Sequence, residues 1–170
     1  TYLNSHHHLP RAYGVMGLYR GEGFQNQINQ AAQLLGVEEN ALLQDPRLNI
    51  LAAAALLDRL IQDSGKSSTD PESLTSVISQ YAGFVDSKSN IQSYARDNFA
   101  YDVLLTLDRG VDGNGIKIQE RAIEWERAFE LDRLVELRAP FVRLDAQSDR
   151  VIIDGYQIDP VTETLKKTAD

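Results

Sequence analysis

The residues best suited to contact a ligand lie near the start of the chain, in the run from Tyr13 to Leu18, YGVMGL. Two glycines three residues apart allow a positive φ at either position and close approach of the backbone to a ligand. The Met side chain is soft and adapts to the surface that lies against it. We therefore predict a turn that lines a binding groove, contacted through Tyr13, Gly14, Met16 and Gly17. The simpler alternative is that the glycines only mark a tight turn.

Two other patterns invite a metal interpretation, and neither supports one. His6, His7 and His8 are adjacent in a loop, where three neighbouring side chains do not easily turn to one ion; they are interpreted as exposed or cleft-edge residues or a tag remnant. The segment 112–115, DGNG, resembles part of a calcium loop. With Gly113 as its sixth position, the third is Gly110 and the twelfth is Gln119, where an EF-hand needs oxygen ligands. We predict no metal, no cofactor and a plain turn between helices.

The sequence near the YGVMGL run has no carboxylate in a context that suits a general acid. Such an acid needs a raised pKa, usually from an apolar pocket. No Glu occurs before Glu22, and Glu22 lies between two glycines, a flexible and wet context that does not raise the pKa of a carboxyl. Asp86 is no better placed. Both are interpreted as surface residues, and the catalytic residue of any reaction is unknown from the sequence.

Composition narrows the function classes. The chain of 170 residues corresponds to one domain, or one domain with a tail. Its 42% hydrophobic and 25% charged residues are ordinary for a soluble protein. A net charge of −8 argues against nucleic acid as a partner. Without cysteine, disulfides and thiol chemistry are excluded, and no apolar run approaches the roughly 18 residues of a membrane span.

The first half of the chain reads as helices that would position the turn. Apolar spacing predicts an amphipathic helix from Phe24 to a terminating Gly36, and then a short helix over 38–43. Asp45-Pro46 is the cap and first residue of a longer helix. Its predicted buried face is Ile50, Ala53, Ala54, Leu57, Leu60 and Ile61, extended by Leu51 and Leu56. We expect this helix to be the most buried one, with little room around Ala54.

The second half is predicted as more helix followed by a small hairpin. Helices are expected from Asp70 to Tyr81 and from Ser89 to Gly110. A long charged helix is expected over 117–138, with Trp125 in the core. Residues 151–158 read as a hairpin on an Asp154-Gly155 type I′ turn, and 162–170 as a tail. The predicted fold is all-α with a small C-terminal β-hairpin, divided into a helical domain over 1–139 and a hairpin with tail or linker over 140–170.

Three segments occur in an order that resembles a known family. They are Gly14-Val15-Met16-Gly17, Ala31-Ala32-Gln33-Leu34-Leu35-Gly36 and Asp45-Pro46-Arg47-Leu48-Asn49-Ile50. This order resembles the lysozyme-like superfamily of soluble lytic transglycosylases and goose-type lysozymes, over roughly residues 1–110. The variant Tyr-Gly-Val-Met-x-Leu is most similar to the module found beside amidase domains in some bacterial cell-wall enzymes. Gly17 stands where the family has Gln, and Tyr81-Ala82-Gly83 resembles its Y-N-A-G-like motif without the Asn.

The resemblance implies a lysozyme-like helical fold that cleaves or binds peptidoglycan glycan strands, and a place in the cell envelope or outside the cell. It adds Tyr81 to the expected substrate-binding residues. Members of the family rely on one Glu at the end of a helix shortly before the G-L-M-Q turn. Thr1-Tyr2 resembles the residues just after that Glu in the family, so we expect a Glu one or two residues upstream in the parent gene. Whether this chain is a lytic transglycosylase or lysozyme-like enzyme is therefore left open.

Two alternatives to a glycan-cleaving module remain. One is a non-catalytic module that positions a neighbouring cell-wall hydrolase, an amidase in a fused downstream domain, on its substrate. The other is a helical protein-interaction domain whose resemblance to the family is accidental.

Overall fold

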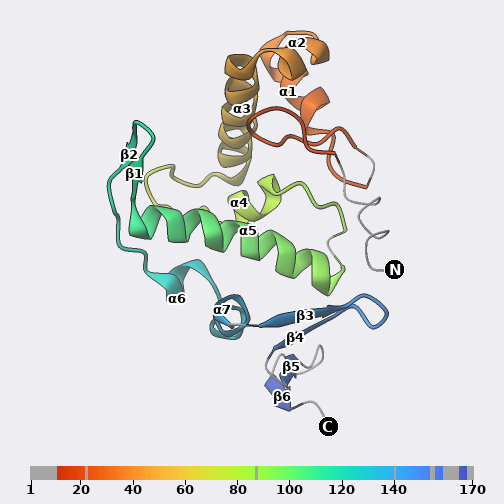
Figure 1. The fold of residues 1–170 in the computed structure, drawn as a ribbon, viewed down its shortest axis with the longest axis vertical. Helices are drawn as coiled ribbons and strands as arrows, with labels where there is room; N and C mark the ends of the chain where they lie inside the picture. Colours follow the sequence, from red (N-terminus) through yellow and green to blue (C-terminus); the bar gives the residue numbers. More distant parts are fainter. Residues whose placement is uncertain are drawn as a thin grey trace. The chain divides into compact units, whose positions relative to one another are not determined.

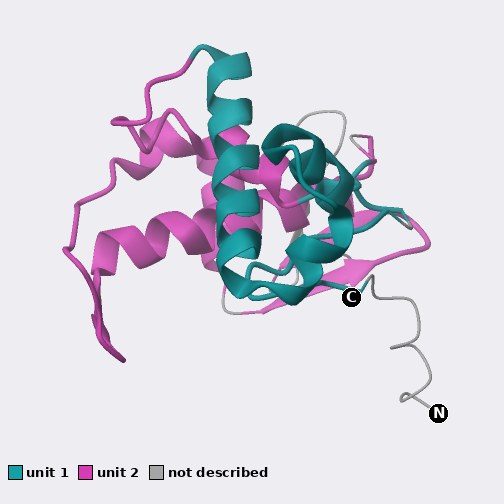
Figure 2. Ribbon diagram, turned by 90° about the horizontal axis from the view of Figure 1, so that it is seen from above, with its two compact units in different colours: residues 1–65, 83–85 teal, residues 66–82, 86–170 magenta. Residues whose placement is uncertain are grey.

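The computed structural model describes residues 11–21, 23–86, 88–139 and 141–153, and the backbone of two further strands, 156–158 and 165–167. His6 to His8, Glu22 and the Asp154-Gly155 turn lie outside the described residues. The chain is mostly helical, as predicted (Figure 1). It forms two compact units, residues 1–65 with 83–85 and residues 66–82 with 86–170 (Figure 2).

Unit 1 contains three helices: α1 (Gln27–Leu35), α2 (Glu39–Gln44) and α3 (Pro46–Ser64). The Asp45 carboxylate accepts the Arg47 N–H at 2.8 Å at the start of α3, which confirms the predicted Asp-Pro start. Gly36 ends α1 in the left-handed conformation, as predicted. Phe24 was expected inside α1, but the Asn26 side chain caps the helix and Phe24 forms a β-bridge with Phe84 instead.

The buried face of α3 differs from the predicted one. Asn49, Ala52, Ala53 and Leu56 are buried, whereas Ile50, Leu51 and Ala54 are exposed. The prediction of a crowded Ala54 is therefore wrong. Apolar residues occur on several sides of this helix, so their spacing alone does not select a face. The polar Asn49 selects it, because its side chain finds hydrogen-bond partners inside unit 1.

Unit 2 begins with α4 (Thr75–Tyr81) and α5 (Asn90–Arg109). Residues 71–74 are turns, so the predicted helix starts later than Asp70. After α5 come β1 (Val111–Gly113) and β2 (Ile116–Ile118), an antiparallel pair joined at Asn114 and Gly115. DGNG is thus a turn, as predicted, but it joins two strands and not two helices.

The long helix predicted over 117–138 is wrong. The chain instead forms β2, an extended segment, then α6 (Trp125–Ala128) and α7 (Leu131–Arg138). The extended segment is held by side chains distant in sequence. Asp108 accepts the Ile123 N–H at 2.9 Å, and Glu72 accepts the Glu124 N–H at 3.1 Å. These tertiary bonds replace the backbone bonds that a helix would have made, so local helix propensity is overridden.

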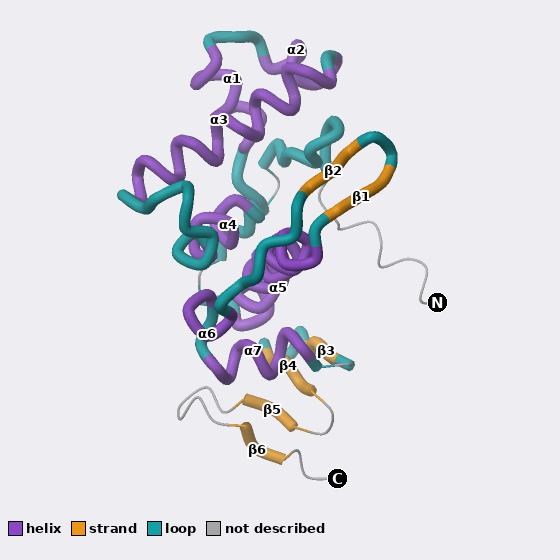
Figure 3. The backbone as a smooth tube through the Cα atoms, turned by 90° about the vertical axis from the view of Figure 1, so that its left-hand side faces the viewer, coloured by secondary structure: helices purple, strands orange, loops and turns teal. Residues whose placement is uncertain are grey.

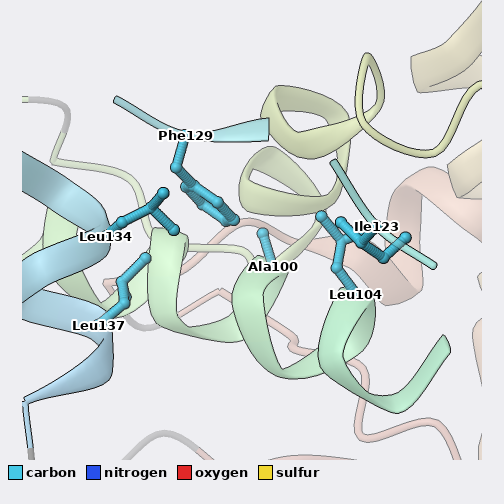
Figure 4. Close-up of a cluster of buried hydrophobic side chains, with 6 residues drawn as sticks. All are labelled: Ala100, Leu104, Ile123, Phe129, Leu134 and Leu137. Atoms are coloured by element: carbon cyan, nitrogen blue, oxygen red, sulfur yellow. The ribbon is translucent and has the colours of Figure 1, made fainter. Parts of the chain in front are cut away.

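The apolar core of unit 2 forms around α5 (Figure 4). Its buried members come from α5, the extended segment, the link between α6 and α7, and α7: Ala100, Leu104, Ile123, Phe129, Leu134 and Leu137. Trp125 packs against this cluster, and its ring lies 4.8 Å from that of Tyr101, centroid to centroid. The prediction that Trp125 belongs to the core is confirmed.

The C-terminal part of unit 2 is a four-stranded antiparallel sheet in the order β3-β4-β5-β6 (Figure 3). Its strands are β3 (Val142–Asp145), β4 (Arg150–Ile153), β5 (Tyr156–Ile158) and β6 (Leu165–Lys167). The predicted hairpin is confirmed as β4 and β5, in which Ile153 pairs with Tyr156. It is only the centre of the sheet, however, and part of the predicted tail is β6. With β1 and β2 as well, "all-α" is corrected to mostly helical with two small sheets.

One aspartate attaches this sheet to the first turn of α5. Asp149 has a positive φ of 51°, and its carboxylate accepts the Asn90 N–H at 2.7 Å, the Ile91 N–H at 3.1 Å and the Ser89 hydroxyl at 2.7 Å. The Asn90 side chain donates in return to the Asp149 carbonyl at 3.1 Å. The first amides of a helix lack intrahelical acceptors, so the β3–β4 turn supplies them from a distance. These bonds lower the pKa of Asp149.

Candidate functional site

The run Tyr13 to Leu18 is a tight turn closed by its own backbone. The Tyr13 N–H donates to the Leu18 carbonyl at 2.9 Å, and the Leu18 N–H donates to the Tyr13 carbonyl at 3.0 Å. Gly14 and Gly17 have φ values of 68° and 62°. Both glycines therefore occupy the left-handed region that other residues enter at a cost, as the spacing predicted.

The Asn49 side chain of α3 holds the turn through hydrogen bonds to its backbone. Its Oδ1 accepts the Met16 N–H at 2.9 Å. Its Nδ2 donates to the Leu42 carbonyl at 3.2 Å and, more weakly, to the Tyr13 carbonyl at 3.5 Å. Asn49 is completely buried, so a single amide side chain joins the turn, the end of α2 and the start of α3.

Gly14 is required by this arrangement for a second reason. A Cβ at Gly14 would lie 2.3 Å from the Asn49 side chain, much closer than atoms can approach. At Gly17 the nearest atom to such a Cβ is the Ala12 methyl, at 3.8 Å. The two glycines of the motif therefore differ: Gly14 makes room for Asn49, whereas Gly17 serves the backbone conformation alone.

The turn presents two apolar side chains to solvent. Val15 is 62% exposed and Met16 is 41% exposed, while Leu18 is buried in unit 1. The half-buried Tyr13 ring carries the Arg11 guanidinium over its face, 5.3 Å from the ring centroid. Rigid backbone with an exposed soft side chain suits a contact surface more than a catalytic centre.

Tyr81 does not belong to the same unit as the other predicted contact residues. It ends α4 in unit 2, where its ring lies 6.2 Å from that of Phe99 and only 9% of the residue is exposed. Burial raises the pKa of its phenol. Unit 1 therefore contains four of the five predicted contact residues, Tyr13, Gly14, Met16 and Gly17. Tyr81 is instead a buried residue of unit 2.

Gly83, the last residue of the partial Tyr81-Ala82-Gly83 motif, lies in unit 1 beside the residue after the turn. A Cβ at Gly83 would lie 2.8 Å from the Tyr19 ring. The Gly83 carbonyl accepts the Gln25 N–H at 2.8 Å, and the Tyr19 N–H donates to Gln27 Oε1 at 3.0 Å. Gln27 and Asn49 are the buried polar residues among the described part of unit 1, and the sequence patterns did not predict either. Asn49 stood inside the Asp45 to Ile50 segment, so its place in that segment was the available signal.

Carboxylates of the described residues do not gather at the turn. Asp86 is exposed, and its Oδ1 accepts the Lys88 N–H at 2.9 Å in unit 2. Burial raises the pKa of Glu136, but this residue is 2% exposed and is paired with Arg133, so a substrate does not reach it. No group of three His, Asp or Glu among the described residues is arranged to hold a metal ion. The described helices also include none with the length and apolarity of a membrane span.

No model of a known family matches the chain, and neither the curated proteins nor the solved structures contain a match to it.

Proposed function

We propose that this chain is a peptidoglycan-binding module of the lysozyme and lytic transglycosylase type, which holds glycan strands through the turn at Tyr13 to Leu18. One observation carries the proposal. The YGVMGL turn and the DPRLNI helix start were related to the family only by their order in the sequence. In unit 1 they are in direct contact, because Asn49 accepts the Met16 amide. This contact supports the proposal, because it makes the two segments parts of one local structure.

The chemistry of the turn suits a sugar. Pyranose rings have apolar faces, and the exposed Val15 and Met16 side chains supply apolar surface against which such a face can lie. The turn is closed by backbone bonds and by Asn49, so little conformational entropy is lost when a ligand binds. Affinity should nevertheless be low, since small ligands gain little free energy per atom.

Binding without cleavage is the better-supported form of this proposal. Protonation of a glycosidic oxygen needs a carboxylic acid that reaches the bond. Glu136 combines burial with a raised pKa, but Arg133 and the surrounding side chains enclose it. We therefore favour a module that positions a neighbouring cell-wall hydrolase, such as an amidase, in the cell envelope or outside the cell.

An NMR titration of the 170-residue chain with chitooligosaccharides and muropeptide fragments tests the proposal. Amide shifts should concentrate at Val15, Met16 and Leu18, and no cleavage product should form. The variant Val15→Ser should weaken binding. Ile116→Ser is the matched control, because Ile116 is 60% exposed but lies in unit 2. Shifts spread over the surface, or equal losses in both variants, would disprove a site at the turn.

A further inference from the structure

The turn between β1 and β2 contains the only asparagine in the chain that is followed by glycine, Asn114-Gly115. Asn114 has φ 52° and Gly115 has φ 78°, which are the positive values of a type I′ turn. The two strands form a sheet of their own, and both residues of the turn are exposed. A two-stranded hairpin is marginally stable in water, so this turn opens more readily than the helices of unit 2.

We propose that Asn114-Gly115 is a site of spontaneous covalent modification in the folded protein, at which the asparagine amide is lost and an isoaspartyl linkage forms. The inference is independent of the proposed function. It rests on the accessibility of one backbone nitrogen and on the weakness of the hairpin that carries it.

The reaction needs only water and the residues present. The Gly115 backbone nitrogen attacks Cγ of Asn114, a new N–Cγ bond forms, and the Cγ–Nδ2 bond breaks. The amide leaves as ammonia and carries away the proton that the Gly115 nitrogen gives up. Water then opens the cyclic imide at either carbonyl, which yields aspartate or isoaspartate. No oxidant or reductant is required.

The structure leaves the attacking nitrogen open. Gly115 has no side chain, and apart from its chain neighbours no atom lies within 4 Å of where its Cβ would be, so the space beside its Cα is open. The ladder pairs Gly113 directly with Ile116, and the residues between them lie outside it. Gly115 therefore loses no strand pairing when its nitrogen reacts.

An aspartate–glycine pair in the same hairpin, Asp112-Gly113, is much less favoured. The Asp112 side chain has no amide to lose as ammonia, and its carboxylate pairs with the Lys117 ammonium at 3.4 Å. The following Gly113 is a paired residue of β1. Asp112-Gly113 is therefore a control that shares the hairpin and the glycine but lacks both favourable features.

Isoaspartate formation has a structural consequence. It places an additional backbone atom in a turn whose two-residue geometry sets the register of Val111 with Ile118 and of Gly113 with Ile116. The main-chain carbonyl of Asn114 also becomes a free carboxylate, which changes the net charge by one unit near Asp112. The modified turn should no longer hold β1 and β2 in register.

The test is incubation of the folded 170-residue protein at mildly acidic and mildly alkaline pH, followed by peptide mapping with mass spectrometry and an isoaspartate assay. Amide loss should concentrate at Asn114 and accelerate with pH, because the attacking nitrogen must be deprotonated. Asn98 and Asn90, which precede Phe and Ile in α5, are the internal controls. Loss at Asn114 no faster than at Asn98 would overturn the proposal.

The variant Asn114→Gly keeps a residue that tolerates positive φ and removes the reactive amide. It should release no ammonia from this segment and should keep the Val111–Ile118 cross-strand signals in NMR spectra. The isoaspartyl form, separated by charge, should lose those signals. Their persistence in the isoaspartyl form would refute the loss of register.

Discussion

Asn49 and Met16, separated by 33 residues, share a hydrogen bond of 2.9 Å between the Asn49 Oδ1 and the Met16 backbone amide. The bond is formed by a completely buried side chain. Leaving a buried donor without a partner typically costs about 1–3 kcal/mol. The conformation of the exposed turn thus depends on one amide group in α3.

Replacing Asn49 with Ala should lower the free energy of unfolding by about 1–3 kcal/mol, because the Met16 N–H and the Leu42 carbonyl lose their partner. Chemical denaturation measures the change. Asn40→Ala, at an exposed position of α2, is the control and should change little. Equal effects of the two substitutions would show that Asn49 does not hold the turn.

Gly14→Ala should be more destabilising than Gly17→Ala. Both substitutions place a side chain at positive φ, at a cost of roughly 1–2 kcal/mol. Only Gly14→Ala also drives a methyl into Asn49, at 2.3 Å, so unit 1 must rearrange. Thermal midpoints compare the two variants, and an equal loss would argue against the close approach of Gly14 to Asn49.

Ala53→Leu should cost about 1–3 kcal/mol through overpacking, whereas Ala54→Leu should change stability little. The two alanines are adjacent, but Ala53 is buried and Ala54 is exposed. The pair of unfolding free energies is the measurement. Comparable losses in both variants would restore the buried face that apolar spacing alone had predicted, since that face included both alanines.

Arg133 forms ion pairs with two carboxylates of unit 2. Its Nε pairs with Asp97 at 3.0 Å, and its Nη1 pairs with the buried Glu136. Arg133→Met should therefore be strongly destabilising, by about 3–5 kcal/mol, because it leaves buried charge without a partner. Glu136→Gln should cost far less, since Arg133 keeps Asp97. Similar losses in both variants would contradict this assignment.

The stability of the protein should depend on pH through the same cluster. Burial raises the pKa of Glu136 against the opposing effect of Arg133, while Asp97 and Asp132 raise it further. The folded state then binds this proton more tightly than the unfolded state, so the contribution of Glu136 to stability increases as the pH falls through its folded pKa. Thermal midpoints measured against pH should show this contribution in the parent chain and lose it in Glu136→Gln. An unchanged difference between the two curves would disprove it.

The contribution of Asp149 to stability should change with pH in the opposite direction to that of Glu136. Its pKa is lowered by the Ser89 hydroxyl and by the Asn90 and Ile91 amides. Its stabilisation is therefore complete above the unfolded-state pKa and is lost as the pH falls through the lower folded value. Asp149→Asn should lower the midpoint at neutral pH and have much less effect in strong acid, by comparison with the exposed control Asp58→Asn. A constant difference across this range would show that the carboxylate charge is not what holds the sheet on α5.

Local signals in the sequence determined the end of α1, the start of α3 and the glycine turn. Asp45-Pro46 and Gly36 act within a few residues of themselves, so no distant contact was needed to predict them. The β4–β5 hairpin was predicted in the same way, from two short runs on either side of the Asp154-Gly155 turn signal. The residues of the turn were correctly placed together, because they are consecutive.

Only the tertiary structure decided which face of α3 is buried and what became of residues 117–138. The predicted buried face did not include Asn49, whose side chain is buried because it finds partners at Met16 and Leu42. The charged segment had helical spacing, yet Asp108 and Glu72 supply acceptors that hold part of it extended. In both cases buried polar groups were satisfied by residues far away in the chain, and the energy of those bonds exceeds the small differences in local propensity.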